Sequence, residues 1–368
     1  QWLDPAATNP RMVLDFLFGQ IAMAQGRAGE AAAWYRSGRE LARRHFLNDP
    51  RLTVLGEVLI RELDLERNRV VVDGEVPQIP KEFWTSGSQL ASYAAASSVA
   101  AELALTLRGS DDAVSLINAM LEHVHQAGLT AMVRYLCALR TQVLADTGRV
   151  AEAESSWSQA GLPDQSAGCL DLRNQSWREM EVLSCTRLRL LIASRNFGAG
   201  RRLLDGLLSL TSRRGLRRTQ MRALALAMTL EESTGDRTAA LDRLKAFLTL
   251  FADSGYARAL IRERDAAVPV LTAFLDAYPQ SPHRESANTL LAASQSGDVL
   301  PVPTLSPRES DILQRLPTQT YQQIAATLGL SRDGVRYHMR RLFDKLQVRD
   351  RNAVVHRARV LGLLPYDR

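Results

Sequence analysis

Cysteine is scarce in this chain of 368 residues, and its three copies, Cys137, Cys169 and Cys185, lie far apart. An odd number of cysteines with wide spacing indicates neither a disulfide framework nor a zinc site. The sequence therefore predicts a protein of a reduced, cytoplasmic compartment that holds no metal.

Motifs of catalysis are missing as well. The sequence contains no nucleophile elbow, no Cys-x-x-Cys pair and no phosphate loop of the Gly-x4-Gly-Lys-Ser/Thr kind. His123 and His125 are two residues apart, so on a helix their side chains would point away from each other and would not share a metal ion. We expect neither enzymatic activity nor a cofactor.

Long apolar runs are also absent. The uncharged stretch at 88–101 is rich in serine and alanine and is followed by Glu102, which predicts a closely packed helix and no membrane span. No charged segment followed by an apolar core opens the chain, so no signal peptide is predicted. Because Gln1 stands where a methionine would begin a nascent protein, we interpret the sequence as a fragment or a processed form.

Positive charge is concentrated at one end of the chain. The whole sequence carries 46 Lys+Arg and 40 Asp+Glu, a formal net charge of +6. Residues 305–368 alone hold 12 basic and 6 acidic side chains, which accounts for the entire excess and leaves the preceding residues balanced. A basic segment of this kind is the electrostatic footprint expected of a protein that binds nucleic acid.

Two short, capped helices begin this basic segment. A Ser-Pro pair at 306–307 suits the N-cap and first position of one helix, and Thr320 with Gln323 has the spacing of a capping box. Gly329 suits the C-cap of the second helix, and Ser331 follows closely as the N-cap of a third. The pattern predicts a helix-turn-helix.

The third helix has two different faces. Its inward face is predicted from apolar residues at helical spacing, Val335, Met339, Leu342 and Leu346. Its opposite face carries arginines at i, i+4 and i+8 with two neighbours, namely Arg332, Arg336, Arg340, Tyr337 and Arg341. An arginine fork can pair with a guanine edge or neutralise a phosphate. The alternative is a solvated basic face without a ligand, which two correctly capped helices beside it disfavour.

These residues together resemble the LuxR-type helix-turn-helix of bacterial transcription regulators. The shared motifs are Ser-Pro-Arg-Glu at 306–309, Gln-Ile-Ala at 323–325, Val-Arg-x-His at 335–338 and Leu-Gly-Leu-Leu at 361–364. The resemblance implies a four-helix domain over residues 305–368 that binds a double-stranded DNA operator. Gly334 replaces a threonine that commonly touches phosphate in the family, so the manner of docking and the target sequence stay open.

The same resemblance implies roles for individual residues. It implies base-edge contacts from Arg336, Tyr337 and Arg340, and a DNA-facing position for Thr320, Gln322, Gln323, Arg332 and Arg341. It also implies a homodimer on DNA, in which the fourth helix pairs two subunits through Val354, Val355, Ala358 and Leu361.

A helical repeat is predicted upstream of this domain. Residues 26–35 match residues 148–157 without a gap, and weaker copies of the turn at Asn68, Gly109, Asn196 and Gly235 complete a series with spacings of 42, 41, 39, 48 and 39 residues. A period near forty predicts an all-α fold in which residues 1–293 form an α-solenoid of tetratricopeptide-like hairpins. The aromatic residues expected in its core are Trp34, Tyr35, Trp157 and Trp177.

Several segments interrupt or end this array. Residues 70–72 are the only β-like run, and loops are predicted at 76–80 and 161–168, where binding faces often lie. Residues 251–263 are predicted to cap the solenoid. The composition of residues 294–304, with Gly297, Pro301 and Pro303, predicts an interdomain linker.

A solenoid followed by a LuxR-type domain resembles the C-terminal part of MalT-like regulators, to which residues 255–258 are also similar. The resemblance implies a solenoid that senses a small-molecule effector and controls the helix-turn-helix, although the upstream nucleotide-binding domain of that group is missing. Two alternatives stay open: a scaffold that binds a regulatory protein, and an array that only sets dimer geometry. We expect a cytoplasmic, nucleoid-associated protein without membrane contact, whose effector-binding residues are unknown.

Overall fold

The computed structural model describes residues 10–45, 50–69, 90–296, 305–346, 348–361 and 363–364. Within these ranges every regular element is a helix, which confirms the all-α prediction. The helices that precede the C-terminal domain are α1 (Pro10–Ala24), α2 (Ala28–His45), α3 (Pro50–Glu66), α5 (Leu90–Arg108), α6 (Ser110–Gln126), α7 (Thr130–Asp146), α8 (Val150–Gln159), α9 (Ser166–Cys169), α10 (Trp177–Ala193), α11 (Phe197–Arg214), α12 (Arg217–Ser233), α13 (Arg237–Ser254), α14 (Arg258–Arg262), α15 (Arg264–Ala277) and α16 (Arg284–Ser296).

The C-terminal domain contains α17 (Pro307–Arg315), α18 (Tyr321–Leu328), α19 (Arg332–Leu346) and α20 (Arg351–Val360). Residues 294–296 of the predicted linker belong to α16, and the rest of that linker lies outside the described residues. The predicted β-like run at 70–72 and the predicted loop at 76–80 also lie outside them. The predicted loop at 161–168 falls in the connection between α8 and α10, which includes α9.

Tight turns separate the helices at the predicted spacing. Five predicted turn residues have φ between 52° and 97°, namely Gly26, Asn68, Gly109, Gly148 and Gly235. At the sixth position the left-handed residue is Arg195, with φ of 56°, one place before the predicted Asn196. Asn196 instead caps α11, because its side chain accepts a hydrogen bond from the backbone N–H of Ala199 at 3.4 Å.

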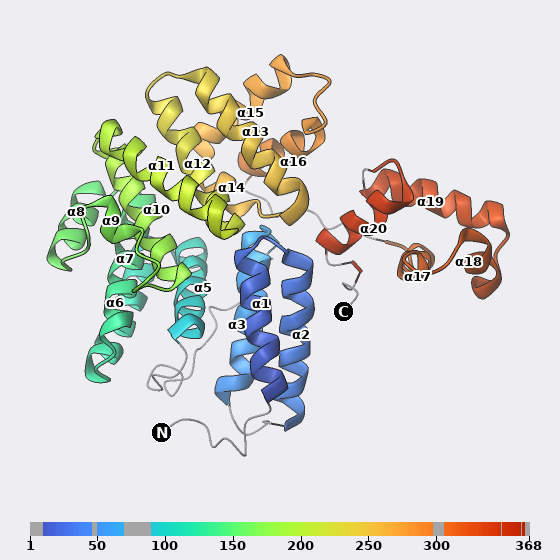
Figure 1. The fold of residues 1–368 in the computed structure, drawn as a ribbon, viewed down its shortest axis with the longest axis horizontal. Coiled ribbons are helices and arrows are strands. Elements are labelled where there is room, and N and C mark those ends of the chain that lie inside the picture. The colour runs from blue at the N-terminus through green and yellow to red at the C-terminus, as the bar shows by residue number, and fades with distance from the viewer. Residues whose placement is uncertain are drawn as a thin grey trace.

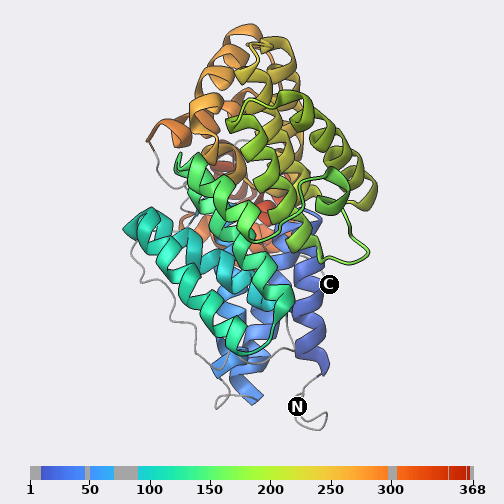
Figure 2. The ribbon, with the colours of Figure 1, turned by 90° about the vertical axis from the view of Figure 1, so that its left-hand side faces the viewer.

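Consecutive helices of the array lie side by side in a curved stack (Figures 1 and 2). Neighbouring pairs also pack on one another, so that α7 contacts α5, α6, α8 and α10. One continuous apolar core runs through the array, from Met12 to Leu290. Tyr35 and Trp157 are buried in it as predicted. Trp34 is partly buried and packs against this core. Trp177 is also only partly buried, and for this residue the prediction of a core position was wrong.

The array differs from an open solenoid, in which each repeat contacts only its neighbours. The segment after α13 returns to the first helices, where the hydroxyl of Tyr256 donates to the carbonyl of Met23 at 3.1 Å. The next backbone N–H, of Ala257, donates to the carbonyl of Glu66 at 2.8 Å. Since α12 also contacts α1, and α14 contacts α3, the segment at 255–258 joins later helices of the array to its first helices. The prediction that residues 251–263 cap the array was wrong, because α15 and α16 follow them and pack on the same core.

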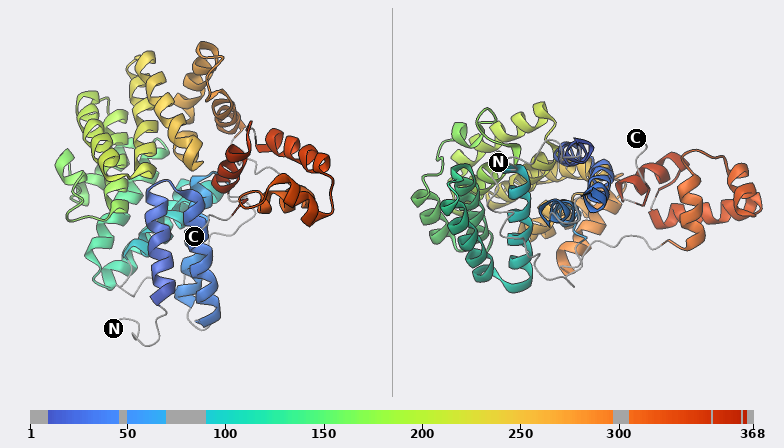
Figure 3. Two further views of the ribbon diagram at one scale, coloured as in Figure 1. Left: turned by 45° about the vertical axis from the view of Figure 1, so that its right-hand side comes forward. Right: turned by 90° about the horizontal axis from the view of Figure 1, so that it is seen from below.

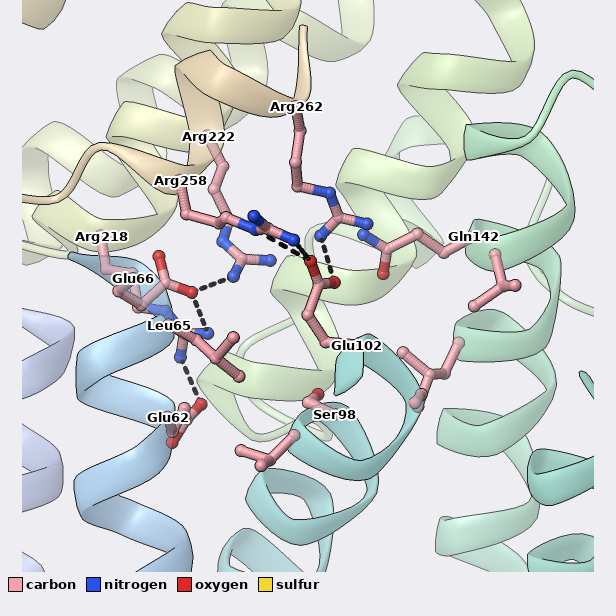
Figure 4. Close-up of a pocket in the computed structure, with 14 residues that line it drawn as sticks. Glu62, Leu65, Glu66, Ser98, Glu102, Gln142, Arg218, Arg222, Arg258 and Arg262 are labelled. Carbon is pink, nitrogen blue, oxygen red and sulfur yellow. Dashed lines mark hydrogen bonds and ion pairs between the residues drawn. The ribbon is translucent and has the colours of Figure 1, made fainter. Parts of the chain in front are cut away.

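A buried cluster of arginines and glutamates fills the space inside this closure (Figure 4). Arg218 of α12 lies 3.0 Å from both Glu62 and Glu66 of α3. Arg178 of α10 donates from Nη2 to the carboxylate of Glu62 at 2.7 Å, and Arg222 of α12 forms an ion pair with Glu66. Ion pairs from two later helices therefore converge on α3. We name these residues and their neighbours Glu102, Glu181, Arg258 and Arg262 the charged cluster.

The arginines of the charged cluster lower the pKa values of its glutamates. Burial alone would raise the pKa of Glu66, but the guanidiniums of Arg218 and Arg222 outweigh it and hold that pKa at about 2. Burial would also raise the pKa of Glu102, but the guanidiniums of Arg262 and Arg258 outweigh it and hold that pKa at about 2. These carboxylates are therefore charged at neutral pH although they are buried.

Candidate nucleic-acid interface

Local sequence determines where the helices of the C-terminal domain begin. The predicted capping box of α18 is formed, because the side chain of Gln323 accepts from the backbone N–H of Thr320 at 2.8 Å. Ser306 is the N-cap of α17 as predicted, and it also forms a capping box that was not predicted, in which the side chain of Glu309 accepts from the backbone N–H of Ser306 at 2.7 Å. Gly329 ends α18 with φ of 63°, a conformation that glycine adopts without steric cost. The predicted helix-turn-helix is confirmed in its local geometry.

The inward face of α19 holds the domain together. Val335, Met339, Leu342 and Leu346 are buried against α17, α18 and α20, as predicted. Arg351, which the sequence analysis left without a role, fastens α20 to the loop before α18 by donating to the carbonyls of Leu316 and Gln319. The orientation of α19 is therefore set by a packed core with polar contacts at its edge.

Glu309 is the buried carboxylate of this domain. Its side chain is 0% exposed and accepts from Lys345 Nζ at 2.6 Å, while Arg341 Nε lies 3.3 Å away. Burial would raise the pKa of Glu309, but the hydrogen bonds from Lys345 and from the backbone of Ser306 outweigh it and lower that pKa. The sequence analysis identified Glu309 only within a family motif. Lys345 and Arg341 lie two helices further on, in α19, so no local pattern predicted these contacts.

The outer face of α19 is open to solvent. Arg332, Arg336, Arg340 and Arg341 are all exposed, and Tyr337 is 56% exposed. Arg336 lies 3.3 Å from Asp333, an exposed i, i+3 pair that holds the side chain only weakly. Arg332 and Arg340 form no ion pair with any residue that the structure describes. Four guanidiniums and a phenol thus share one face of a rigid helix.

The predicted DNA contacts on α18 are exposed as well. Gln322 projects from its first turn, and Thr320 and Gln323 are exposed while bonded to each other in the capping box. Figures 1 and 3 show α17, α18 and α19 projecting from the helical array, with α20 nearest to it. The array therefore leaves the outer face of α19 uncovered.

The predicted dimerisation residues of α20 take part in the core of their own domain. Val354 and Ala358 are 0% exposed within it, which makes their side chains unavailable to a second subunit in this structure. Val355 and Leu361 are partly buried against the same core. The carbonyl of Leu361 accepts from Arg69 Nη1 at 2.8 Å, and α20 contacts α2, so this helix also connects the domain to the array.

A capped helix-turn-helix with an exposed basic helix is the architecture of a DNA-binding domain. Residues 303–358 match the GerE family, described as bacterial regulatory proteins, luxR family. The chain thus carries a LuxR-family helix-turn-helix domain at these positions. No curated protein matches the chain.

Neither a metal site nor a membrane-spanning helix is found among the described residues. No group of three or more histidine, cysteine or acidic side chains in the described ranges is arranged to hold a metal ion. Among the same residues, no helix combines the length and the apolar character needed to cross a membrane.

Proposed function

We propose that this protein is a transcription regulator in which the outer face of α19 reads a DNA operator and the helical array responds to a small-molecule effector. The exposed arginine ladder of α19 carries the first part of the proposal. Successive arginines four residues apart are separated by about 6 Å along a helix axis, close to the rise of two base pairs. One helix can therefore present several guanidiniums to successive base edges and phosphates of a major groove.

In this proposal, Arg336, Tyr337 and Arg340 contact base edges because they lie on the middle of the exposed face. Arg332 and Arg341 lie toward its ends and contact phosphates. Thr320, Gln322 and Gln323, at the start of α18, approach the adjacent backbone, where a helix N-terminus favours an anion. Arg341 has a second task, since it is also near Glu309.

Control by the array requires a physical connection, and the contact between α2 and α20 supports one. Arg69 donates to the carbonyl of Leu361, and His356 lies 3.9 Å from Asp253 of α13. A shift of the first helices of the array would act on α20 through these contacts. We retain a homodimer on DNA as part of the proposal, with Val355 and Leu361 as the partly exposed apolar residues that pair.

The test uses the full chain. Duplexes enriched by the protein from a random pool should bind with an affinity that falls steeply with salt, with a log–log slope of about −0.9 per phosphate contacted. A metabolite panel in a thermal-shift assay should contain a ligand that raises stability, by about 2.7 kcal/mol at a hundred times its dissociation constant. If no sequence is enriched, operator recognition is wrong. If the panel is flat and a partner protein co-purifies, the array is a protein scaffold instead.

A further inference from the structure

We propose that a groove between residues 170–177 and the junction of α11 with α12 binds a small organic anion that has a flat apolar body. This inference rests on the proposed function, since it assigns the effector site of the array. The groove is open to solvent and has a volume of about 500 Å³, within the range of small-molecule sites, roughly 300–1,000 Å³. The cavity in the charged cluster, at about 40 Å³, has room for only a few water molecules.

The lining of the groove is mainly apolar. Leu170, Leu172 and Trp177 form one side, and Leu210 and Leu216 form the other. All five side chains are partly buried, so apolar surface remains open inside a concave site. Pockets for small organic ligands combine such surface with a few polar groups. Trp177 does not reach the core position predicted for it because it belongs to this groove.

The polar groups at the rim favour an anion. Arg173 and Arg214 line the groove, are exposed, and have no side-chain hydrogen bond or ion pair with any residue that the structure describes. The one lining carboxylate, Asp171, is already engaged by the side chain of Asn174 at 2.7 Å and the backbone N–H of Arg173 at 3.0 Å. These hydrogen bonds lower the pKa of Asp171 and keep it charged. Two guanidiniums that form no hydrogen bond or ion pair within the described residues therefore line the groove, and such forks favour carboxylate or sulfonate oxygens.

The wall formed by the α8–α10 connection is built in advance of binding. Cys169 is 0% exposed and donates from Sγ to the carbonyl of Pro163 at 3.4 Å. Gln175 Nε2 donates to the carbonyl of Gly168 at 2.7 Å. A side chain at Gly206 of α11 would place its Cβ 2.9 Å from Leu170 Cδ1, so the glycine permits this close approach. A wall that is already ordered reduces the entropy cost of binding.

Trp177 links the groove to the charged cluster. The guanidinium of Arg178 lies 4.4 Å from the centre of its ring, and that of Arg218 lies 5.2 Å away. Both arginines bind Glu62 and so hold α3 against α10 and α12. A ligand packed against Trp177 would therefore contact the same helices, α10 and α12, that the charged cluster joins to α3. Binding of the ligand should raise the melting temperature of the array.

The experiment uses anilinonaphthalene sulfonate, a flat fluorescent anion, with the full chain. Its affinity is measured by titration for the wild type, for Arg173→Gln/Arg214→Gln, and for Arg213→Gln. Arg213 is the matched control, because it is exposed and adjacent but bonds to the carbonyl of Ser209 in its own helix. We expect the double variant to lose about tenfold in affinity and the control to keep wild-type affinity.

The uncharged relative, phenylnaphthylamine, provides the second arm. It should bind all three proteins with the same affinity, because only the sulfonate needs the arginines. Equal binding of the anion by the wild type and the double variant would overturn the proposed site. A metabolite that stabilises the wild type and the double variant equally would likewise refute the groove, while effector sensing by the array would stand. If no DNA sequence is enriched from the random pool, DNA recognition is refuted, while the binding of the anion and the stabilisation by a metabolite are unaffected.

Discussion

Replacing Arg218 with alanine should open the closed array. Arg218 lies 3.0 Å from Glu62, 3.0 Å from Glu66 and 3.5 Å from Glu181, and all four side chains are at most 5% exposed. At an effective dielectric constant of about 20, each close contact is worth roughly 5 kcal/mol before desolvation. Arg178 and Arg222 remain to neutralise part of the freed charge, so we expect a net loss of about 3–5 kcal/mol. In differential scanning calorimetry that loss lowers the melting temperature by about 6–20 °C.

The neighbouring residue provides the control. Arg217 lies 3.8 Å from Asp253 with both side chains about half exposed, so Arg217→Ala should cost less than about 1 kcal/mol. If the two variants melt at the same temperature, the charged cluster does not hold the array closed.

Three further predictions concern charge. The stability of the wild type should fall as the pH is lowered from 4.5 to about 2, because the pKa of Glu66 and that of Glu102 drop from 4.5 to about 2 on folding. Each of these glutamates contributes about 3 kcal/mol of stability that is present above pH 4.5. The melting temperature measured across this pH range tests the prediction. Glu309→Ala should destabilise α17 and α19 by about 1–3 kcal/mol, which hydrogen exchange of their backbone amides measures as faster exchange. Glu309→Gln should have a smaller effect, since glutamine keeps an acceptor for the backbone N–H of Ser306. Arg69→Ala should broaden the distance distribution between spin labels on α2 and α20, and an unchanged distribution would show that this hydrogen bond does not hold the domain.

The features that the sequence predicted correctly depend on neighbouring residues. The Ser306 N-cap, the Thr320–Gln323 capping box, the Gly329 turn and most of the inward face of α19 are each defined by residues close in sequence, where spacing determines geometry. The repeat turns were predicted for the same reason, because a glycine or asparagine that ends a helix needs no distant partner. At the turn predicted for Asn196 the prediction was displaced by one residue, since Arg195 adopts the left-handed conformation and Asn196 forms the cap.

Features that depend on distant residues left no pattern in the sequence. Arg178 and Glu62 are separated by 116 positions, and each appears in its own helix as an ordinary charged residue. Their burial follows from the return of residues 255–258 to α1 and α3, which a repeat period does not encode. Trp177 was placed in the core because tryptophan is usually buried there, and its exposure follows from the α8–α10 connection. Val354 and Ala358 were assigned to a partner surface by family resemblance, whereas the structure buries them in their own domain.

DNA recognition by α19 is the central claim, and fluorescence anisotropy on a selected duplex tests it most directly. Arg336→Ala and Arg340→Ala should each weaken binding by about 1–3 kcal/mol, whereas Arg213→Ala, the same loss of charge on α11, should leave the affinity unchanged. Wild-type affinity in both α19 variants would contradict the claim that these arginines read the operator.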